Sequence, residues 1–177
     1  KMTGAFDRIR RSGKPVEAMA EVVPETRRLA EDGADGHPDP HVWMDVELWA
    51  LVSASVRDEL IAVDPDGRDD YEANAARYIE RLEALDAWAI ESMATIPEAS
   101  RVLVTAHDAF GYLGARYGVD VVGIQGISTE SEAGLRHIEA IVDLLVTQKI
   151  GAVFVESTVP ARNVQALIAG AKARGHE

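Results

Sequence analysis

The chain has 177 residues, of which 47% are hydrophobic and 27% charged, a balance typical of a globular rather than a disordered protein. Its 30 acidic and 18 basic residues give a formal net charge of -12, which argues against a nucleic-acid partner because phosphate binding needs a clustered positive surface. Cysteine is absent, which excludes disulfides and thiol chemistry. No charge-free stretch approaches the roughly 20 residues of a transmembrane helix, so we expect no transmembrane segment in this chain.

The first third of the chain predicts a loop followed by a helix. Residues 31–40 (EDGADGHPDP) are acidic and rich in turn formers, without apolar periodicity, which predicts a loop. Asp45 is a suitable N-cap for a helix over residues 46–62. The spacing predicts that this helix turns one stripe inward, formed by Trp49, Val52, Val56 and Leu60.

A second, longer helix is predicted from Asp66 to Met93. Asp64 followed by Pro65 is a favourable helix start, with Asp64 as the N-cap. Apolar residues then recur at spacings of three and four, and no proline interrupts them before residue 97. At 1.5 Å per residue the helix spans about 40 Å. It can lie within a bundle or serve as a strut between two lobes.

Beyond residue 97, short apolar runs alternate with helical segments. Three runs are continuous and rich in β-branched residues, as buried parallel strands are: RVLVT (101–105), VDVVGI (119–124) and AVFVE (152–156). Helices are predicted after each of them, over 108–117, 130–148 and 159–174, the second opened by a capping box at 129–132. This alternation predicts a doubly wound α/β lobe with adjacent parallel strands.

The ends of these strands carry the candidate chemistry, because ligands of open α/β sheets bind beyond the carboxyl ends of the strands. His107 lies two positions after the first run, Gln125 follows the second, and Glu156 ends the third. Imidazole with carboxylate is a ligand set for zinc, manganese or iron. A helix-start histidine bonded to the backbone and a carboxylate at a helix N-terminus are the structural alternatives, and both stay open.

The remaining histidines differ in their settings. In residues 37–41 (HPDPH) two prolines impose an extended or turned backbone, so the two histidines are not the i, i+4 pair of a helical metal motif. His41 precedes the apolar VWM that leads into a helix and is predicted to be held in place, whereas His37 is predicted to lie loosely in the loop. His137 and His176 are predicted to face solvent.

Four stretches resemble, in the same order, motifs of the zinc/manganese solute-binding proteins of ABC importers. They are DPHVWMD (39–45), TAHDAFGY (105–112), GISTESE (126–132) and FVEST (154–158). The resemblance covers the chain from Gly13 to its end, and four ordered motifs are far more specific than any one of them.

The resemblance implies two α/β lobes with parallel sheets bridged by one long rigid helix, with metal bound in the cleft between the lobes. Residues 1–65 would be a partial N-terminal lobe, residues 66–96 the bridging helix, and residues 97–177 a partial C-terminal α/β lobe, so that both lobes are incomplete here. His41 from the first lobe and His107 from the second would be metal ligands, with Glu156 orienting a ligand imidazole. The family's first histidine ligand and last aspartate ligand have no counterpart in this sequence.

The same resemblance implies a function. The protein is expected to bind Zn²⁺ or Mn²⁺ as a transported ligand, outside the cytoplasm (in the periplasm or as a cell-surface lipoprotein), and to deliver it to the membrane permease of an ABC importer. No enzymatic activity is expected. His107 favours zinc as the softer donor, whereas the lack of the long histidine-rich loop that zinc-dedicated members often carry counts against zinc, so both metals stay open. The alternatives are a chelate-binding protein (siderophore or corrinoid) of similar shape, a metal-dependent hydrolase using His41, His107 and Glu156, and a structural α/β module.

Overall fold

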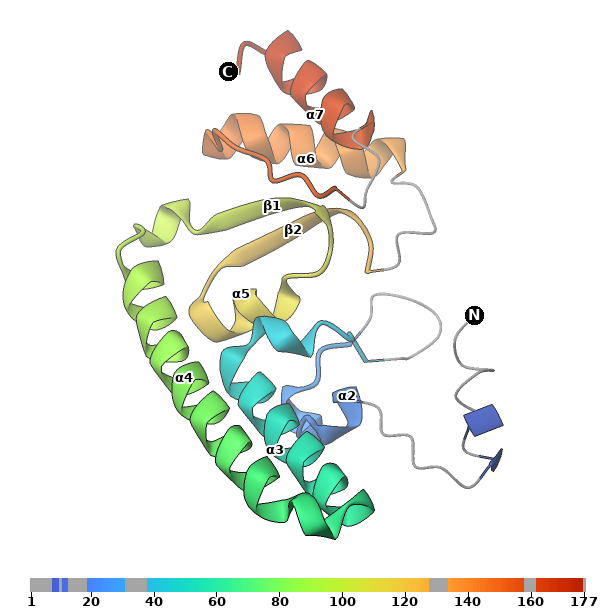
Figure 1. The fold of residues 1–177 in the computed structure, drawn as a ribbon. Helices are drawn as coiled ribbons and strands as arrows, with labels where there is room; N and C mark the ends of the chain where they lie inside the picture. The colour runs from blue at the N-terminus through green and yellow to red at the C-terminus, as the bar shows by residue number, and fades with distance from the viewer. Residues whose placement is uncertain are drawn as a thin grey trace.

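The computed structural model describes residues 8–9, 11–12, 19–30, 38–127, 134–157 and 162–176. Figure 1 shows two helices, α3 and α4, running side by side in the lower part of the view and a small sheet with α6 and α7 in the upper part. The short helix α5 lies between the sheet and α3. No helix in the described part of the chain is both long and apolar enough to cross a membrane.

Short helical elements make up most of the first region in its described residues. A short helix α2 (Met19–Val22) and two 3-10 turns, η1 (Glu25–Arg27) and η2 (Val42–Met44), precede α3 (Val46–Val63). The predicted cap is confirmed, because the Asp45 side chain accepts a hydrogen bond from Leu48 N. The only pairing that the structure describes before α3 is one antiparallel bridge between Ala30 and Pro38. Most of the predicted loop 31–40 lies outside the described residues.

The predicted inward stripe of α3 is wrong in two of its four members. Val52 is buried, but Val56 and Leu60 are 40% and 44% exposed, and the other buried residues are Leu48 and Ile61. The physical reason is that α3 has two neighbours. One side of the helix packs into the core, whereas the side that carries Val56 and Leu60 borders an open groove between α3 and α4.

The long helix is confirmed as one unbroken element, α4 (Arg68–Ala94). The predicted start at Asp64 and Pro65 belongs to a 3-10 turn η3 (Pro65–Gly67) that leads into α4: Asp64 is the N-cap of this turn, Gly67 is the N-cap of α4, and neither makes a side-chain capping hydrogen bond. The Asp64 carboxylate instead accepts a hydrogen bond from the Tyr71 hydroxyl at 2.8 Å. The helix ends shortly before Pro97, which restricts the residue before it to extended backbone.

After a 3-10 turn η4 (Glu98–Ser100), two strands form a parallel pair, β1 (Val102–His107) and β2 (Asp120–Gln125), with the register Val102 to Asp120 and His107 to Gln125. The crossover is α5 (Gly111–Tyr117), which starts three residues later than predicted. It ends at Gly118, whose φ of 69° is left-handed backbone that favours glycine.

The predicted third strand, AVFVE, is wrong as a strand but right in direction. Only Phe154 pairs, through a parallel bridge to Thr105, and its N–H donates to Val104 O at 2.9 Å. Phe154 and Val155 are 57% and 65% exposed, so this segment is not the buried strand that was predicted. Helix α6 (Leu135–Gln148) precedes this segment and α7 (Arg162–Ala173) follows it; the predicted capping box and the expected starts of both helices lie outside the described residues.

Two hydrophobic clusters organise the molecule. The first joins the α2 region, η2 and α3 and includes Tyr112 from α5. The second joins the sheet to α6 and α7 and contains Val104, Ala106 and Ile124. Because side chains alternate along a strand, Thr105, His107 and Gln125 lie on the opposite face of the sheet, toward α5 and the first region.

Candidate metal site

His41 is fixed by the short loop that precedes α3. The carboxylate oxygen Oδ1 of Asp39 accepts hydrogen bonds from His41 N at 2.9 Å and from His41 Nδ1 at 2.7 Å. Asp39 is 2% exposed and His41 9%, so both groups are held inside the protein. An aspartate bonding to a backbone N–H two residues later is an Asx turn, and Pro40 between them restricts the backbone further. The expectation that His41 is held in place is confirmed.

His107 is the last residue of β1 and meets Glu156 at the same sheet edge. Its Nδ1 lies 2.7 Å from Glu156 Oε1. Glu156 is brought there by Phe154, whose backbone bonds to the middle of β1. The prediction that His107 and Glu156 share the carboxyl edge of the sheet is therefore confirmed.

The two imidazoles lie next to each other although they come from different regions. Their ring centroids are 5.6 Å apart and the planes are inclined by 63°. An ionised carboxylate can only accept hydrogen bonds, so Nδ1 carries a proton in each ring, and in the neutral tautomer Nε2 is the nitrogen with a free lone pair. A histidine oriented in this way by a carboxylate is the arrangement found around protein-bound metals.

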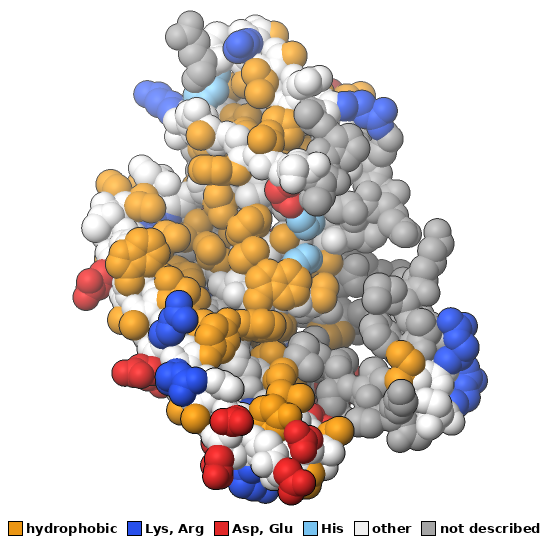
Figure 2. All heavy atoms as spheres, viewed as in Figure 1, with side chains coloured by type: hydrophobic (Ala, Val, Ile, Leu, Met, Phe, Trp, Pro, Cys, Tyr) orange, Lys and Arg blue, Asp and Glu red, His pale blue; other side chains and the backbone are white. Residues whose placement is uncertain are grey.

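The surroundings of this pair are largely apolar on the side that the structure describes. The Trp43 ring packs edge-on to His41, with centroids 5.3 Å apart, and is itself 47% exposed. In Figure 2 histidine atoms lie beside an acidic side chain at the junction of the upper and lower parts of the molecule, next to a broad hydrophobic area. Among the described residues, no group of three or more His, Cys, Asp or Glu side chains is arranged to hold a metal ion.

Of the other histidines, the structure describes His137 and His176, and each of these rings contacts a backbone carbonyl. His37 lies outside the described residues. His137 is exposed, as predicted, and its Nε2 lies 2.9 Å from Gly123 O. The prediction for His176 is wrong, because its ring is half-buried and contacts Ile150 O at 2.7 Å, which ties the end of α7 back to the preceding segment.

Two residues near the pair were not identified from the sequence as parts of a site. Asp39 was visible in the motif, and the Asx-turn pattern of Asp-Pro-His is a signal that could have identified it. Tyr112 contacts a segment far away in sequence, and no local pattern reveals that contact. Gln125, which the strand-end argument did select, is 5% exposed beside His107 in the register; its Oε1 is buried and has no partner in the described part of the chain.

An ion-pair network joins three helices. Arg116 of α5 donates two hydrogen bonds to Asp86 of α4 and pairs with Glu47 of α3 at 2.9 Å. Hydrogen bonds from Arg116 lower the pKa of Asp86, and Asp86 in turn raises the pKa of Arg116. Burial, together with its hydrogen bond to Asp86, raises the pKa of the Tyr117 hydroxyl to about 12.

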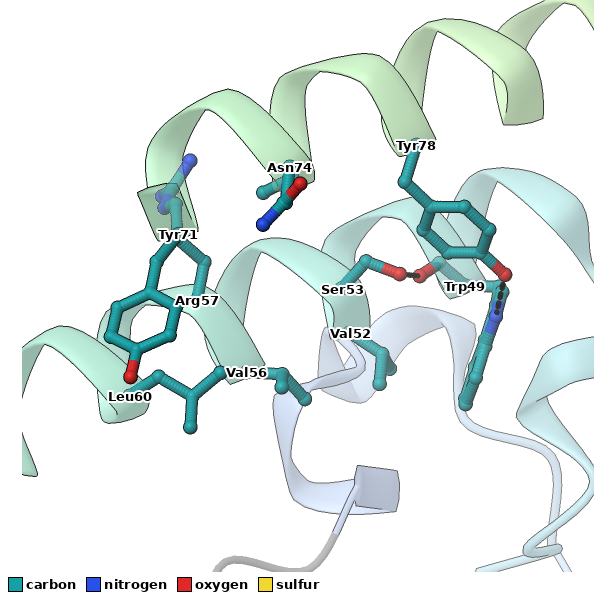
Figure 3. A pocket seen from close by; sticks show the side chains of 10 residues that line it. Trp49, Val52, Ser53, Val56, Arg57, Leu60, Tyr71, Asn74 and Tyr78 are labelled. Carbon is teal, nitrogen blue, oxygen red and sulfur yellow. Dashed lines mark hydrogen bonds between the residues drawn. The ribbon is translucent and has the colours of Figure 1, made fainter. Parts of the chain in front are cut away.

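The larger grooves do not contain the histidine pair. One of about 400 Å³ runs between α3 and α4 and is mainly apolar, with Trp49 Nε1 donating to the Tyr78 hydroxyl at 3.0 Å across it (Figure 3). A second, of about 460 Å³, lies on the other side of these helices near Asp86 and Arg116. Neither groove is lined by His41 or His107, so the candidate site is defined by ligand chemistry and not by cavity size.

A long helix, a parallel sheet and two imidazoles oriented by carboxylates fit the class of solute-binding proteins, and comparison with known proteins identifies the family. The family model "Zinc-uptake complex component A periplasmic" (ZnuA) matches residues 1–176. The chain belongs to this family of solute-binding proteins.

Relatives and solved structures agree with this assignment. The chain is 44% identical to the manganese-binding lipoprotein MntA of Bacillus subtilis over 163 residues, covering 92% of this chain and 53% of the relative. It is 38% identical to the zinc-binding protein TroA of Treponema pallidum over 176 residues, covering 99% and 56%. The periplasmic zinc-binding protein TroA structure superposes with a TM-score of 0.92 over 99% of this chain and 62% of that one, which confirms the expected fold class. The chain thus spans about half the length of the curated relatives it matches.

Proposed function

We propose that the full-length protein captures a Zn²⁺ or Mn²⁺ ion outside the cytoplasm and delivers it to the membrane permease of an ABC importer, with His41 and His107 as two of the metal ligands. The observation that carries the proposal is the pair of rings 5.6 Å apart, each with its Nδ1 held by a carboxylate. Relatives named as manganese-binding and zinc-binding proteins support it.

The ligand is an ion and not a chelate. The ring centroids are 5.6 Å apart, which is close enough for both imidazoles to reach one cation and too close for a siderophore or corrinoid to lie between them. The two rings come from different regions of the chain, so an ion bound to both of them would join those regions. Imidazole suits zinc and carboxylate suits manganese, so the choice between the two metals depends on the ligands that complete the set.

Capture and release suit the site better than catalysis. A catalytic metal site keeps one position open and needs a nearby base. Here the carboxylates next to the two imidazoles, Asp39 and Glu156, are both hydrogen-bonded to Nδ1 and serve to orient the rings. The family description as a periplasmic uptake component and relatives named as lipoproteins support an extracytoplasmic carrier that works with a permease.

Calorimetric titration of the full-length protein with zinc and manganese tests the proposal. His41→Ala and His107→Ala should each weaken binding by more than about 100-fold, since each removes a ligand rather than an orienting partner. His137→Ala is the matched control and should leave the affinity unchanged, because that ring is exposed and bonded to Gly123 O.

If the His107→Ala protein binds metal with wild-type affinity, His107 is not a ligand and the proposed site is wrong. Hydrolysis of nitrophenyl esters or phosphates by the zinc-loaded protein, lost in the same variants, would replace the carrier by the hydrolase.

A further inference from the structure

A chain of hydrogen bonds runs from α5 to His41. The backbone N–H of Leu29 donates to the hydroxyl oxygen of Tyr112 at 3.1 Å. Leu29 O accepts from Asp39 N at 2.9 Å, and the Asp39 carboxylate holds His41 through both its backbone N and its Nδ1. Each step is a direct contact between buried or half-buried groups.

The start of this chain is anchored firmly. Tyr112 is 1% exposed and packs within the first hydrophobic cluster, together with Val42, the residue after His41. Burial raises the pKa of its hydroxyl, so the group stays neutral and able to accept the bond. The first turn of α5 also touches the same segments, because a Cβ added to Gly111 would lie 3.3 Å from Leu29 Cδ1 and 3.4 Å from Asp39 Oδ2.

The same short segment carries the other imidazole. Tyr112 follows His107 by five residues, at the point where β1 turns into α5. The position of α5 therefore depends on β1, and the position of the Asp39 loop depends on α5. A displacement of Tyr112 relative to Leu29 changes the placement of His41 with respect to His107.

We propose that Tyr112 is a positioning residue of the metal site: its hydroxyl, acting through Leu29 and Asp39, fixes the distance and orientation of the His41 ring relative to the His107 ring. This inference depends on the proposed function, since it assigns Tyr112 a role in the geometry of that same site. Tyr112 does not touch the ion. It acts by holding a ligand before the ion arrives, which reduces the cost of ordering the site on binding.

A pair of matched variants separates positioning from stability. Tyr112→Phe and Tyr117→Phe each delete one partly or fully buried hydroxyl from α5, and the second removes the 2.9 Å bond to Asp86 while leaving the bond to Leu29 intact. Tyr112→Phe should weaken zinc and manganese binding about 5- to 10-fold, the equivalent of one hydrogen bond. Tyr117→Phe should lower the melting temperature but change the affinity less than about 2-fold, well inside the effect of a single lost bond.

Two measurements on the metal-free protein distinguish this role from general loosening. Nitrogen-15 spectra of the imidazoles should show displaced His41 resonances in Tyr112→Phe and unchanged ones in Tyr117→Phe. Amide exchange at Leu29 should be protected in the wild type and faster in Tyr112→Phe.

The inference is overturned if the wild type binds metal and Tyr112→Phe binds equally well with unmoved His41 resonances, or if Leu29 is unprotected in the wild type. A wild-type protein that binds neither metal overturns the proposed function itself, which is a separate result.

Discussion

At the level of single residues, the two histidines have the same kind of partner in different environments. Asp39 and Glu156 both lie 2.7 Å from an Nδ1, but their side chains are 3% and 26% exposed. Asp39 also accepts a backbone N–H, whereas Glu156 has the single bond to His107 among the hydrogen bonds described for it. A buried carboxylate acts through a lower effective dielectric, so its charge strengthens the donor more.

This difference predicts unequal effects of matched amide substitutions. Asp39→Asn should weaken metal binding by about 10- to 100-fold, within the range for partners that orient ligands, and Glu156→Gln should fall at or below the lower end of that range. Calorimetric titration of both variants with zinc measures the two affinities, and unfolding in urea checks that Glu156→Gln leaves stability nearly unchanged. A larger loss for Glu156→Gln would show that exposure is not what separates the two carboxylates.

The sequence predicted the principal atoms of this site for identifiable reasons. His107 and Glu156 follow apolar runs, and the strand-end rule places them at one edge even though the third run pairs at a single residue. His41 was selected because prolines and an apolar anchor restrain it. The contact of Leu29 with Tyr112 joins residues 83 apart, and no periodicity or local turn pattern encodes such a contact.

At the level of secondary structure, periodicity predicted which residues share a face but not what covers that face. The α3 helix shows this, because Val56 shares a stripe with Val52 and is nevertheless exposed in the groove beside α4. Likewise, β-branched composition predicted a third strand, but only one residue of it, Phe154, pairs in the structure. In both cases the outcome depends on neighbours that are distant in sequence.

The ion-pair network makes an element-level prediction about pH. The pKa of Asp86 is lowered by Arg116, so the unfolded chain takes up a proton at higher pH than the folded one does. The contribution of Asp86 to stability is thus fully present above its ordinary pKa of 3.8 and is lost as the pH falls through the lower folded value. Asp86→Asn should cost about 1–3 kcal/mol of unfolding free energy at pH 7, and much less at low pH.

Urea unfolding at pH 7 and near pH 3 measures this dependence. The control is Asp143→Asn, which removes an exposed ion pair with Arg174 and should cost less than about 0.5 kcal/mol at either pH. An Asp86→Asn protein with the same pH dependence as the wild type would mean that this carboxylate is not a source of acid sensitivity.

At the level of the whole molecule, we propose the division into a partial first lobe (1–65), a bridging helix (66–96) and a partial second lobe (97–177). The two separate hydrophobic clusters support it. The crossover helix α5 qualifies it, because it belongs to the second lobe by sequence but places Tyr112 in the first cluster and Arg116 against α3 and α4. Contacts made by α5 therefore help to fix the separation of the two imidazoles, one from each proposed lobe.

Two cores joined in this way should loosen separately. Leu48 is buried in the first cluster and Leu167 in the second, at 1% and 0% exposure. Truncating either to alanine removes comparable apolar volume and should cost about 2–5 kcal/mol. Native-state amide exchange should show that loss locally. Leu167→Ala should speed exchange in β1, β2, α6 and α7, while the opening free energy of α3 changes by less than about 1 kcal/mol. Leu48→Ala should speed exchange in α3 and leave the sheet, α6 and α7 nearly unchanged. Equal acceleration of both regions by either variant would show a single cooperative unit, and the lobes would then be a description of shape without energetic independence.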